Sequence, residues 1–301
     1  SPPRRGLSCA TFAMPVSIVF GASGAIGRFL LPRLLRAEHD VIAISREPRA
    51  SGNAWLRWIA GGLPDRMPSL PPAATIFSLG PLDAFAGWLA AHGSRDAHII
   101  AIGSRSIATK RDSADAGERD VAGRLARAED TLARLADAGA RITVLRPTLI
   151  YGAGLDRSLT PLVAFARRWR IFPYVAGARG LRQPVHADDL AAACIALAGA
   201  MPSHRAYDVG GGERIAFSEM LHRVRASLPF AAIAVPVPIA VAKAGAGLAR
   251  ISPAFRAASA GALARMREDL LADHATAVAD FGWSPRAFRP GAGDWMPPPL
   301  P

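Results

Sequence analysis

The seven residues Gly21-Ala22-Ser23-Gly24-Ala25-Ile26-Gly27 constrain the fold of this 301-residue chain more than any other feature. They lie directly between an apolar run, Val16–Phe20, and a stretch, Ile26–Ala37, whose apolar residues recur at three- and four-residue spacing. In that strand-turn-helix context the three glycines predict a dinucleotide-binding loop: the first makes a tight turn, the second lets the backbone approach a pyrophosphate, and the third lets helix and strand pack closely. The helix N-terminus then offers free N–H groups to the anion. An ordinary strand-helix turn is the alternative interpretation.

The first half of the chain alternates short β-branched apolar runs with helical stretches, as in a parallel sheet covered on both faces. The expected strands are Val16–Phe20, Val41–Ser45, Leu56–Ile59, Thr75–Leu79, His98–Gly103 and Ile142–Arg146. The expected helices are Ile26–Ala37, Leu82–His92 and Ala114–Ala138. The sequence therefore predicts an α/β fold with a Rossmann-type doubly wound parallel sheet.

The alternation stops near Tyr151, which predicts a smaller C-terminal substrate lobe. We expect residues 1–13 to be a disordered tail, 14–150 to be the dinucleotide-binding Rossmann core, and 151–301 to be a mixed substrate-binding lobe with elements that return to the core. The proline-rich end, Met296–Pro301, is expected to fray. The apolar segment Pro236–Arg250, with Lys243 as its only internal charge, predicts a lobe helix over the pocket, with a membrane-surface helix as the alternative.

Composition excludes several classes of function. The formal charge of +12 comes almost entirely from arginines spread along the chain, and without a nucleic-acid-binding motif it favours small anionic ligands instead of nucleic acid. Two cysteines without metal-ligand spacing predict neither a disulfide framework nor a metal site. The sequence contains no apolar run of about 18 residues and no signal-peptide pattern, so we expect a cytoplasmic protein without a membrane span.

The end of the second expected strand bears on the choice of cofactor. An NAD site usually carries an acidic residue there, which bonds the ribose hydroxyls. This chain has Ser45 and Arg46 at that point, and an arginine can bind a 2′-phosphate through charge-assisted hydrogen bonds. The sequence therefore favours NADP(H) over NAD(H), unless Arg46 is merely solvated and Glu47 takes the acidic role.

Several motifs carry a resemblance to one family. The Gly-x-x-Gly-x-x-Gly loop, Leu145-Arg146-Pro147-Thr148-Leu149-Ile150-Tyr151-Gly152 and Arg182-Gln183-Pro184-Val185-His186-Ala187-Asp188-Asp189-Leu190 resemble the extended and atypical short-chain dehydrogenase/reductases, including the NAD-dependent epimerase/dehydratase group. The likeness continues through Tyr207-Asp208-Val209-Gly210-Gly211 and Phe281–Arg286, so it covers nearly the whole chain.

The resemblance implies roles for further residues. It places Leu79 and Gly80 beside the adenosine ribose, Pro147, Leu149 and Ile150 at the nicotinamide end, and Tyr151 and Arg182 on the substrate side. An arginine there could grip phosphate or carboxylate through two bonds, although a surface arginine is the alternative. Within the glycine loop it assigns cofactor contacts to Gly21, Ser23, Gly24, Ala25, Ile26 and Gly27. Related proteins often dimerise through the helix expected at Ala114–Ala138, which makes a homodimer one expectation.

The family's proton chemistry rests on a Tyr-x-x-x-Lys pair that this chain lacks. Aligning the glutamate that follows the lysine to Glu129 puts Val121 and Leu125 at the tyrosine and lysine positions, and no tyrosine or lysine occurs from Arg111 to Ile150.

Replacement candidates lie after the fifth expected strand. Ser104 or Ser106 matches the family's catalytic serine region, and Lys110 could donate a proton if desolvation tuned it, with a solvated lysine as the alternative. His186 is expected to be a structural hydrogen-bonding residue, and Asp188 and Asp189 are expected to cap a helix.

Two functions follow from these patterns. The first is an NADP(H)-dependent oxidoreductase or epimerase that transfers hydride to or from a carbonyl or alcohol of a small substrate, with an anionic one favoured. The second is a non-catalytic NADP(H)-binding sensor or accessory protein, which the absent tyrosine and lysine would explain.

Overall fold

The computed structural model describes seven stretches of the chain: residues 14–47, 49–93, 96–113, 115–175, 177–202, 204–238 and 266–301. The expected N-terminal tail and most of the apolar segment 236–250, including Lys243, lie outside these residues. Among the described residues, no helix is both long and apolar enough to cross a membrane. In the same part of the chain, no three potential metal-ligating side chains form a group.

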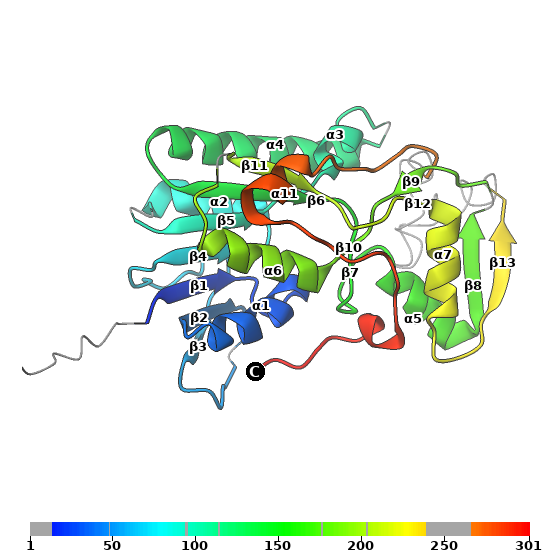
Figure 1. Cartoon of the computed structure of the whole chain (residues 1–301), viewed down its shortest axis with the longest axis horizontal. Helices are drawn as coiled ribbons and strands as arrows, with labels where there is room; N and C mark the ends of the chain where they lie inside the picture. The colour runs from blue at the N-terminus through cyan, green and yellow to red at the C-terminus, as the bar shows by residue number, and fades with distance from the viewer. Residues whose placement is uncertain are drawn as a thin grey trace, which may run out of the picture.

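A seven-stranded parallel sheet forms the centre of the larger part of the molecule (Figure 1). Its strand order is β11-β6-β5-β4-β1-β2-β3, and every neighbouring pair is parallel. The strands are β1 (Val16–Phe20), β2 (Asp40–Ser45), β3 (Leu56–Ala60), β4 (Thr75–Ser78), β5 (His98–Ile102), β6 (Ile142–Pro147) and β11 (Ala206–Val209). This confirms the predicted doubly wound fold, and six of the strands match the expected runs to within one residue at each end.

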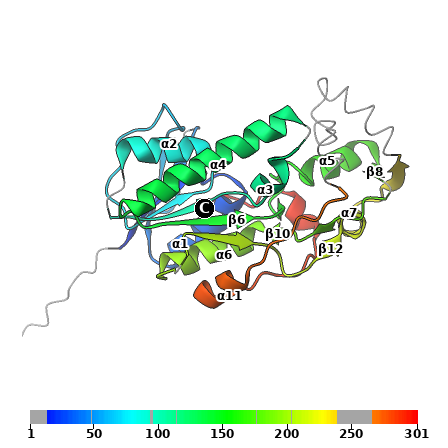
Figure 2. The same ribbon diagram turned by 90° about the horizontal axis from the view of Figure 1, so that it is seen from above.

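Helices cover both faces of the sheet (Figure 2). One face carries α1 (Ala25–Arg36), α6 (Ala187–Ala198) and α11 (Ala275–Phe281), while the other carries α2 (Leu82–His92) and α4 (Ala116–Asp137). Successive side chains of a strand point to opposite faces, so alternate residues enter two separate cores. Val19 and Phe77 pack toward α1 and α6, whereas Ile18 and Ile76 pack toward α2 and α4.

The smaller lobe lies beyond the carboxyl ends of the sheet strands (Figure 1). It contains α5 (Thr160–Trp169), β8 (Ile171–Val175), α7 (Phe217–Ala226) and β13 (Ile233–Val237), with β8 and β13 paired in parallel. Its core includes Tyr151, Phe172, Phe288 and Trp295. Two short pairs connect lobe and core: β7 (Ile150–Tyr151) with β10 (Val185–His186), and β9 (Leu181–Arg182) with β12 (Ile215–Ala216).

The C-terminal segment returns from the lobe to the Rossmann core. After the short helix η2 (Ala292–Trp295), Leu300 packs against the core beneath α1, and Arg28 donates a hydrogen bond to the carbonyl of Pro298. The expectation that Met296–Pro301 frays is therefore wrong, because a side chain and a carbonyl of this segment are both held by the core.

Candidate functional site

The glycine loop between β1 and α1 is pressed against the end of β4. Gly21 has φ of +75°, a conformation that favours glycine, and a Cβ built there would lie 2.9 Å from the carbonyl carbon of Leu79. The Leu79 amide donates to the Phe20 carbonyl at 3.0 Å, which fixes this approach. A Cβ on Gly27 would overlap the Ala22 carbonyl oxygen, so the third glycine is required for the helix to pack against the loop.

The N-terminus of α1 is open to an anion. Its N-cap, Gly24, is extended and provides no side-chain cap, and the first turn contains no acidic residue. A Cβ on Gly24 would meet only the Gly21 carbonyl oxygen, at 3.1 Å, apart from its neighbours in the chain, so little other protein covers this residue on that side. Uncapped N–H groups at the positive end of a helix dipole, beside a bare backbone, fit the diphosphate of a dinucleotide.

Arginines gather at the carboxyl end of β2. Ser45 is buried, and its hydroxyl accepts hydrogen bonds from the Glu47 amide and from Nε of Arg49, both at 3.3 Å. Arg46 is exposed, and its aliphatic chain runs past Gly62. Burial lowers the pKa of Arg28, at the start of α1, and the nearby charge of Arg49 lowers that pKa further. The sequence indicated Arg46 here, but Arg28 and Arg49 emerge only from the fold.

The ends of β5, β6 and β11 lie at the same edge of the sheet. The Arg105 amide donates to the Pro147 carbonyl at 2.9 Å, and the Thr148 amide donates to Val209 at 3.1 Å. These bonds bring Ser104 and the Pro147–Ile150 segment to the edge that carries the glycine loop. Lys110 ends the short helix α3 (Ser106–Lys110), which packs beside α4, and the side chain of Ser106 lies outside the described part.

A chain of charged groups links α4 to this edge. Nε of Arg146 lies 2.9 and 3.1 Å from the two carboxylate oxygens of Glu129, and these hydrogen bonds raise the pKa of Arg146 although burial opposes them. Asp208, on β11, pairs with Arg105 at 3.0 Å. Glu129 was only an alignment anchor in the sequence, whereas the structure shows that it holds β6 to α4. Leu125, one turn earlier on α4, packs against the core on that face of the sheet.

Tyr151 and Arg182, the two residues expected on the substrate side, are both buried, with 1% and 5% of their surface exposed. The Tyr151 ring lies edge-on to His186 with centroids 5.0 Å apart, and burial raises the pKa of its hydroxyl above the usual range. Arg182 donates to the carbonyls of Leu181 and Glu268 at 2.8 and 2.6 Å, and burial lowers its pKa. A substrate could reach either residue only if the covering groups moved, so their roles stay predictions.

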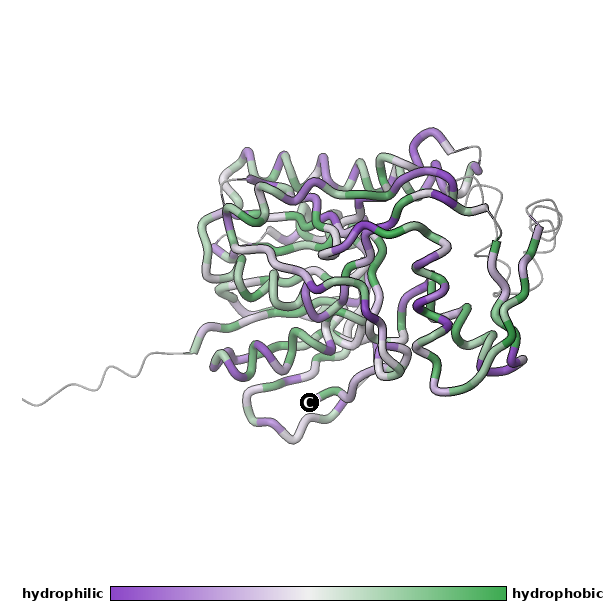
Figure 3. Tube along the Cα trace, turned by 45° about the vertical axis from the view of Figure 1, so that its right-hand side comes forward, coloured by the Kyte–Doolittle hydropathy of each residue, from purple (hydrophilic) through white to green (hydrophobic). Residues whose placement is uncertain are grey.

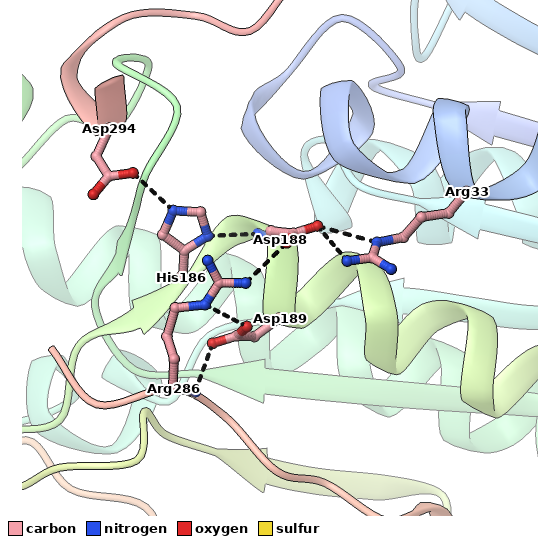
Figure 4. Close-up of polar contacts among 6 residues, drawn as sticks. All are labelled: Arg33, His186, Asp188, Asp189, Arg286 and Asp294. Atoms are coloured by element: carbon pink, nitrogen blue, oxygen red, sulfur yellow. Dashed lines mark hydrogen bonds and ion pairs between the residues drawn. The ribbon is translucent and has the colours of Figure 1, made fainter. Parts of the chain in front are cut away.

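His186 caps helix α6 and anchors a network that joins three parts of the chain (Figure 4). Its Nδ1 accepts from the Asp188 amide at 3.1 Å, so Nε2 carries the proton and donates to Asp294 at 3.1 Å. The expectation that Asp188 and Asp189 cap the helix is wrong, because both carboxylates are bound by arginines. Asp188 accepts from Arg33 at 2.6 and 3.0 Å and from Arg286 at 2.8 Å, and Asp189 accepts from Arg286 at 2.8 Å.

This network fixes the charge of Asp188. Burial alone would raise its pKa, but the hydrogen bonds from Arg33 and Arg286 hold the pKa below its ordinary value. Both nitrogens of His186 are occupied, and the side chain is 5% exposed. His186 is therefore a positioning residue of the fold, as the sequence predicts.

Searches among protein-family models and among curated proteins gave no match to this chain. Solved structures do match over nearly its whole length. MoeE5 in complex with UDP-glucuronic acid and NAD shows 19% identity and a TM-score of 0.65, with 93% of this chain and 98% of that chain covered. UDP-glucuronic acid 4-epimerase from Bacillus cereus in complex with NAD shows 12% identity and a TM-score of 0.68, with 93% and 96% covered.

A third neighbour extends the same pattern. UDP-glucose 4-epimerase from Thermotoga maritima with UDP-glucose shows 14% identity and a TM-score of 0.66, with 94% of this chain and 97% of that chain covered. These identities are low, so the likeness concerns the fold. The chain has the fold of the NAD-dependent epimerases and dehydratases of the extended short-chain dehydrogenase/reductase family.

Proposed function

We propose that this chain binds a nicotinamide dinucleotide between the glycine loop and the carboxyl ends of β2 and β4. The observation that carries the proposal is the geometry of the loop, in which Gly21 and Gly27 are required by close backbone contacts and the N-terminus of α1 has no cap. The neighbours in complex with NAD have the same fold, which supports this assignment.

The arginines at the end of β2 favour NADP(H) over the NAD bound by those neighbours. Arg28, Arg46 and Arg49 lie around Ser45, and a 2′-phosphate placed there would receive charge-assisted hydrogen bonds. Glu47 follows Arg46 directly, and its carboxylate lies 3.7 Å from Arg49 and is mostly exposed. We infer that Glu47 orients Arg49 and does not bind the ribose hydroxyls.

With the dinucleotide bound, the proposed activity is that of an oxidoreductase or epimerase. The nicotinamide would supply or accept a hydride, and the substrate would be a small anionic alcohol or carbonyl compound. Nucleotide sugars are the class we propose, because MoeE5 and both epimerases are bound to or act on such compounds. Ser104, Ser106 and Lys110 are the candidates for orienting the reacting oxygen and moving its proton.

The helix α4 supports a second candidate, a non-catalytic NADP(H)-binding protein. Glu129 holds α4 to Arg146 of β6, and the alignment anchored on Glu129 places Val121 and Leu125 at the tyrosine and lysine positions. Neither side chain can exchange a proton. A protein that binds the dinucleotide through its glycine loop but has no catalytic tyrosine and lysine on α4 would have these features.

Calorimetric titration of the purified chain with NADPH and NADH tests the cofactor assignment. We expect NADPH to bind roughly ten to a hundred times more tightly, since a hydrogen bond to a charged group contributes about 1.5–3 kcal/mol. Arg46→Ala and Arg49→Ala should each remove much of this ratio, whereas Arg36→Ala, at the far end of α1, should leave it unchanged. Equal affinities would refute the NADP(H) preference. If neither dinucleotide binds, the proposed function itself is wrong.

A further inference from the structure

One face of the small lobe sheet is entirely apolar. In the parallel register of β8 and β13, Ile171 pairs with Ile233, Pro173 with Val235, and Val175 with Val237. Alternate residues of a strand share a face, so these six side chains lie together. Phe172 points the other way, into the lobe core, where it is 1% exposed.

Among the described residues, three of the six side chains on this face are exposed, and Pro173, Val175 and Val237 are half-buried. Ile233 is 71% exposed, Ile171 39% and Val235 37%, and Trp169, immediately before β8, is 57% exposed. Figure 1 places the two strands at the end of the molecule far from the Rossmann core, and Figure 3 shows hydrophobic stretches along them, interrupted by paler, more polar ones. Exposed β-branched side chains do not stabilise the folded chain. A contiguous apolar face of this kind therefore points to a binding surface.

Arginines lie at one end of the face, and its two strands carry no acidic residue. The exposed stretch Arg167-Arg168-Trp169-Arg170 leads into β8, and residues 167–175 and 231–238 contain no aspartate or glutamate. Arg168 lies over the Trp169 ring at 4.8 Å, and Arg170 lies over the Phe230 ring at 4.6 Å. Arg225 also reaches this edge, where it donates to the Ala232 carbonyl at 3.2 Å.

Arg170 occupies a position where glycine would be favoured. It ends α5 with φ of +57°, and its carbonyl accepts the Ile233 amide at 2.9 Å, which joins the two strands. A left-handed conformation is unfavourable for a side chain with a Cβ. The chain nevertheless keeps a cationic side chain at the border of the apolar face.

We propose that the apolar face of β8 and β13, together with its Arg167–Arg170 border, docks this protein onto an anionic phospholipid surface. Aliphatic side chains enter the acyl boundary, tryptophan favours the interface, and arginines pair with anionic headgroups. This inference concerns the lobe alone and does not depend on the proposed activity at the glycine loop.

A second copy of the chain fits this face less well. A two-fold contact uses the same patch on both copies, so it would bring two sets of these arginines into one interface without supplying any acidic partner. The six side chains also form a patch much smaller than the 20–30 residues a side of a standard protein interface. An anionic bilayer meets neither objection, because it neutralises the arginines and accepts a small apolar insertion.

Vesicle co-sedimentation of the full chain tests the proposal. We expect binding to vesicles of mixed phosphatidylglycerol and phosphatidylcholine, little binding to phosphatidylcholine alone, and weaker binding as salt rises. Each arginine near an anionic surface contributes about a fivefold gain in affinity, so Arg167→Gln with Arg168→Gln should weaken binding roughly 25-fold. The matched control, Arg127→Gln with Arg134→Gln on exposed positions of α4, removes the same charge and should have little effect.

A second pair of variants separates lipid docking from protein packing. Trp169→Ser with Ile233→Ser should lower vesicle affinity and leave the melting temperature unchanged, whereas Trp55→Ser, equally exposed in the Rossmann core, should change neither. Binding that is the same for parent and variants, or absent in the parent, would overturn the proposal. So would a lower melting temperature with unchanged vesicle affinity, which would assign the face to residues 239–265 or to a second copy of the chain.

Discussion

Gly24 and Gly27 lie three residues apart in one loop, yet their environments predict opposite effects of substitution. A Cβ at Gly27 would overlap the Ala22 backbone, which cannot move without separating α1 from β1. Gly27→Ala should therefore lower the free energy of unfolding by about 1–3 kcal/mol, the usual cost of overpacking. Chemical denaturation of the cofactor-free protein measures this effect.

Gly24→Ala serves as the contrasting variant. Its Cβ would meet only the Gly21 carbonyl oxygen, at 3.1 Å, so the fold should tolerate it with a small loss of stability. The methyl group would instead occupy the space where a pyrophosphate approaches the backbone, and NADPH affinity should fall. If Gly24→Ala binds NADPH as the parent does, the loop does not hold the pyrophosphate.

Individual residues also show where sequence patterns stop being informative. The glycine roles could be predicted because a tight turn and a helix-strand contact are local events. The burial of Arg182 could not, since one of its carbonyl partners, Glu268, lies 86 residues away in the chain. The charges of Arg28 and Arg49 likewise interact only because α1 packs beside β2.

At the scale of single elements, the sequence predicted the buried strands β1, β4 and β5 and also the more exposed strand β3 to within one residue. β1, β4 and β5 are short, mainly apolar runs with buried polar residues at Ser17, Thr75, Ser78 and His98, and a short buried run bounded by turns is typical of a strand in a parallel sheet. The start of α6 was predicted less well, because aspartates at a helix N-terminus usually cap it. Here His186 takes the capping position, and the arginines that bind the aspartates come from α1 and the C-terminal segment.

The pairing of Arg286 with α6 leads to a prediction about stability. Arg286 binds Asp188 and Asp189, whose side chains are only 22% and 11% exposed, so removing it leaves half-buried carboxylates with fewer partners. Arg286→Ala should lower the free energy of unfolding by about 1–2 kcal/mol.

The control is Arg205→Ala, which removes the ion pair with Asp137. Both of those side chains are more than half exposed, so this variant should change the free energy of unfolding by about 0.5 kcal/mol at most. Equal effects of the two variants would show that the network on α6 adds nothing to stability.

Across the whole molecule, the sheet and the lobe are both assembled from distant parts of the chain. β11 completes the sheet from the second half of the sequence, and α6 covers α1 from the same half. The lobe combines α5 and β8 with α7, β13 and the segment around Trp295. The sequence predicted that elements return to the core, but periodicity alone does not say which surface each will cover.

Catalysis would depend on residues that the fold brings together from distant parts of the chain. If the protein is an enzyme, its proton donor does not lie on α4, which contains neither tyrosine nor lysine. Lys110→Met and Ser104→Ala should then each lower turnover of NADPH with a nucleotide-sugar substrate by about 10²–10⁴-fold, as for loss of general acid-base catalysis, while NADPH affinity changes little. Arg111→Met, at the next and exposed position, is the matched control for Lys110.

The opposing variant restores the missing pair with Val121→Tyr and Leu125→Lys. Because Leu125 packs against the core beneath α4, a melting curve must first show that this variant folds, with Val121→Phe and Leu125→Met as the apolar control. If the parent is an enzyme, the added pair should not create activity that the parent lacks, since its own donor already reaches the substrate. If the double variant reduces a substrate that neither the parent nor the apolar control reduces, the parent is a dinucleotide-binding protein without catalytic activity.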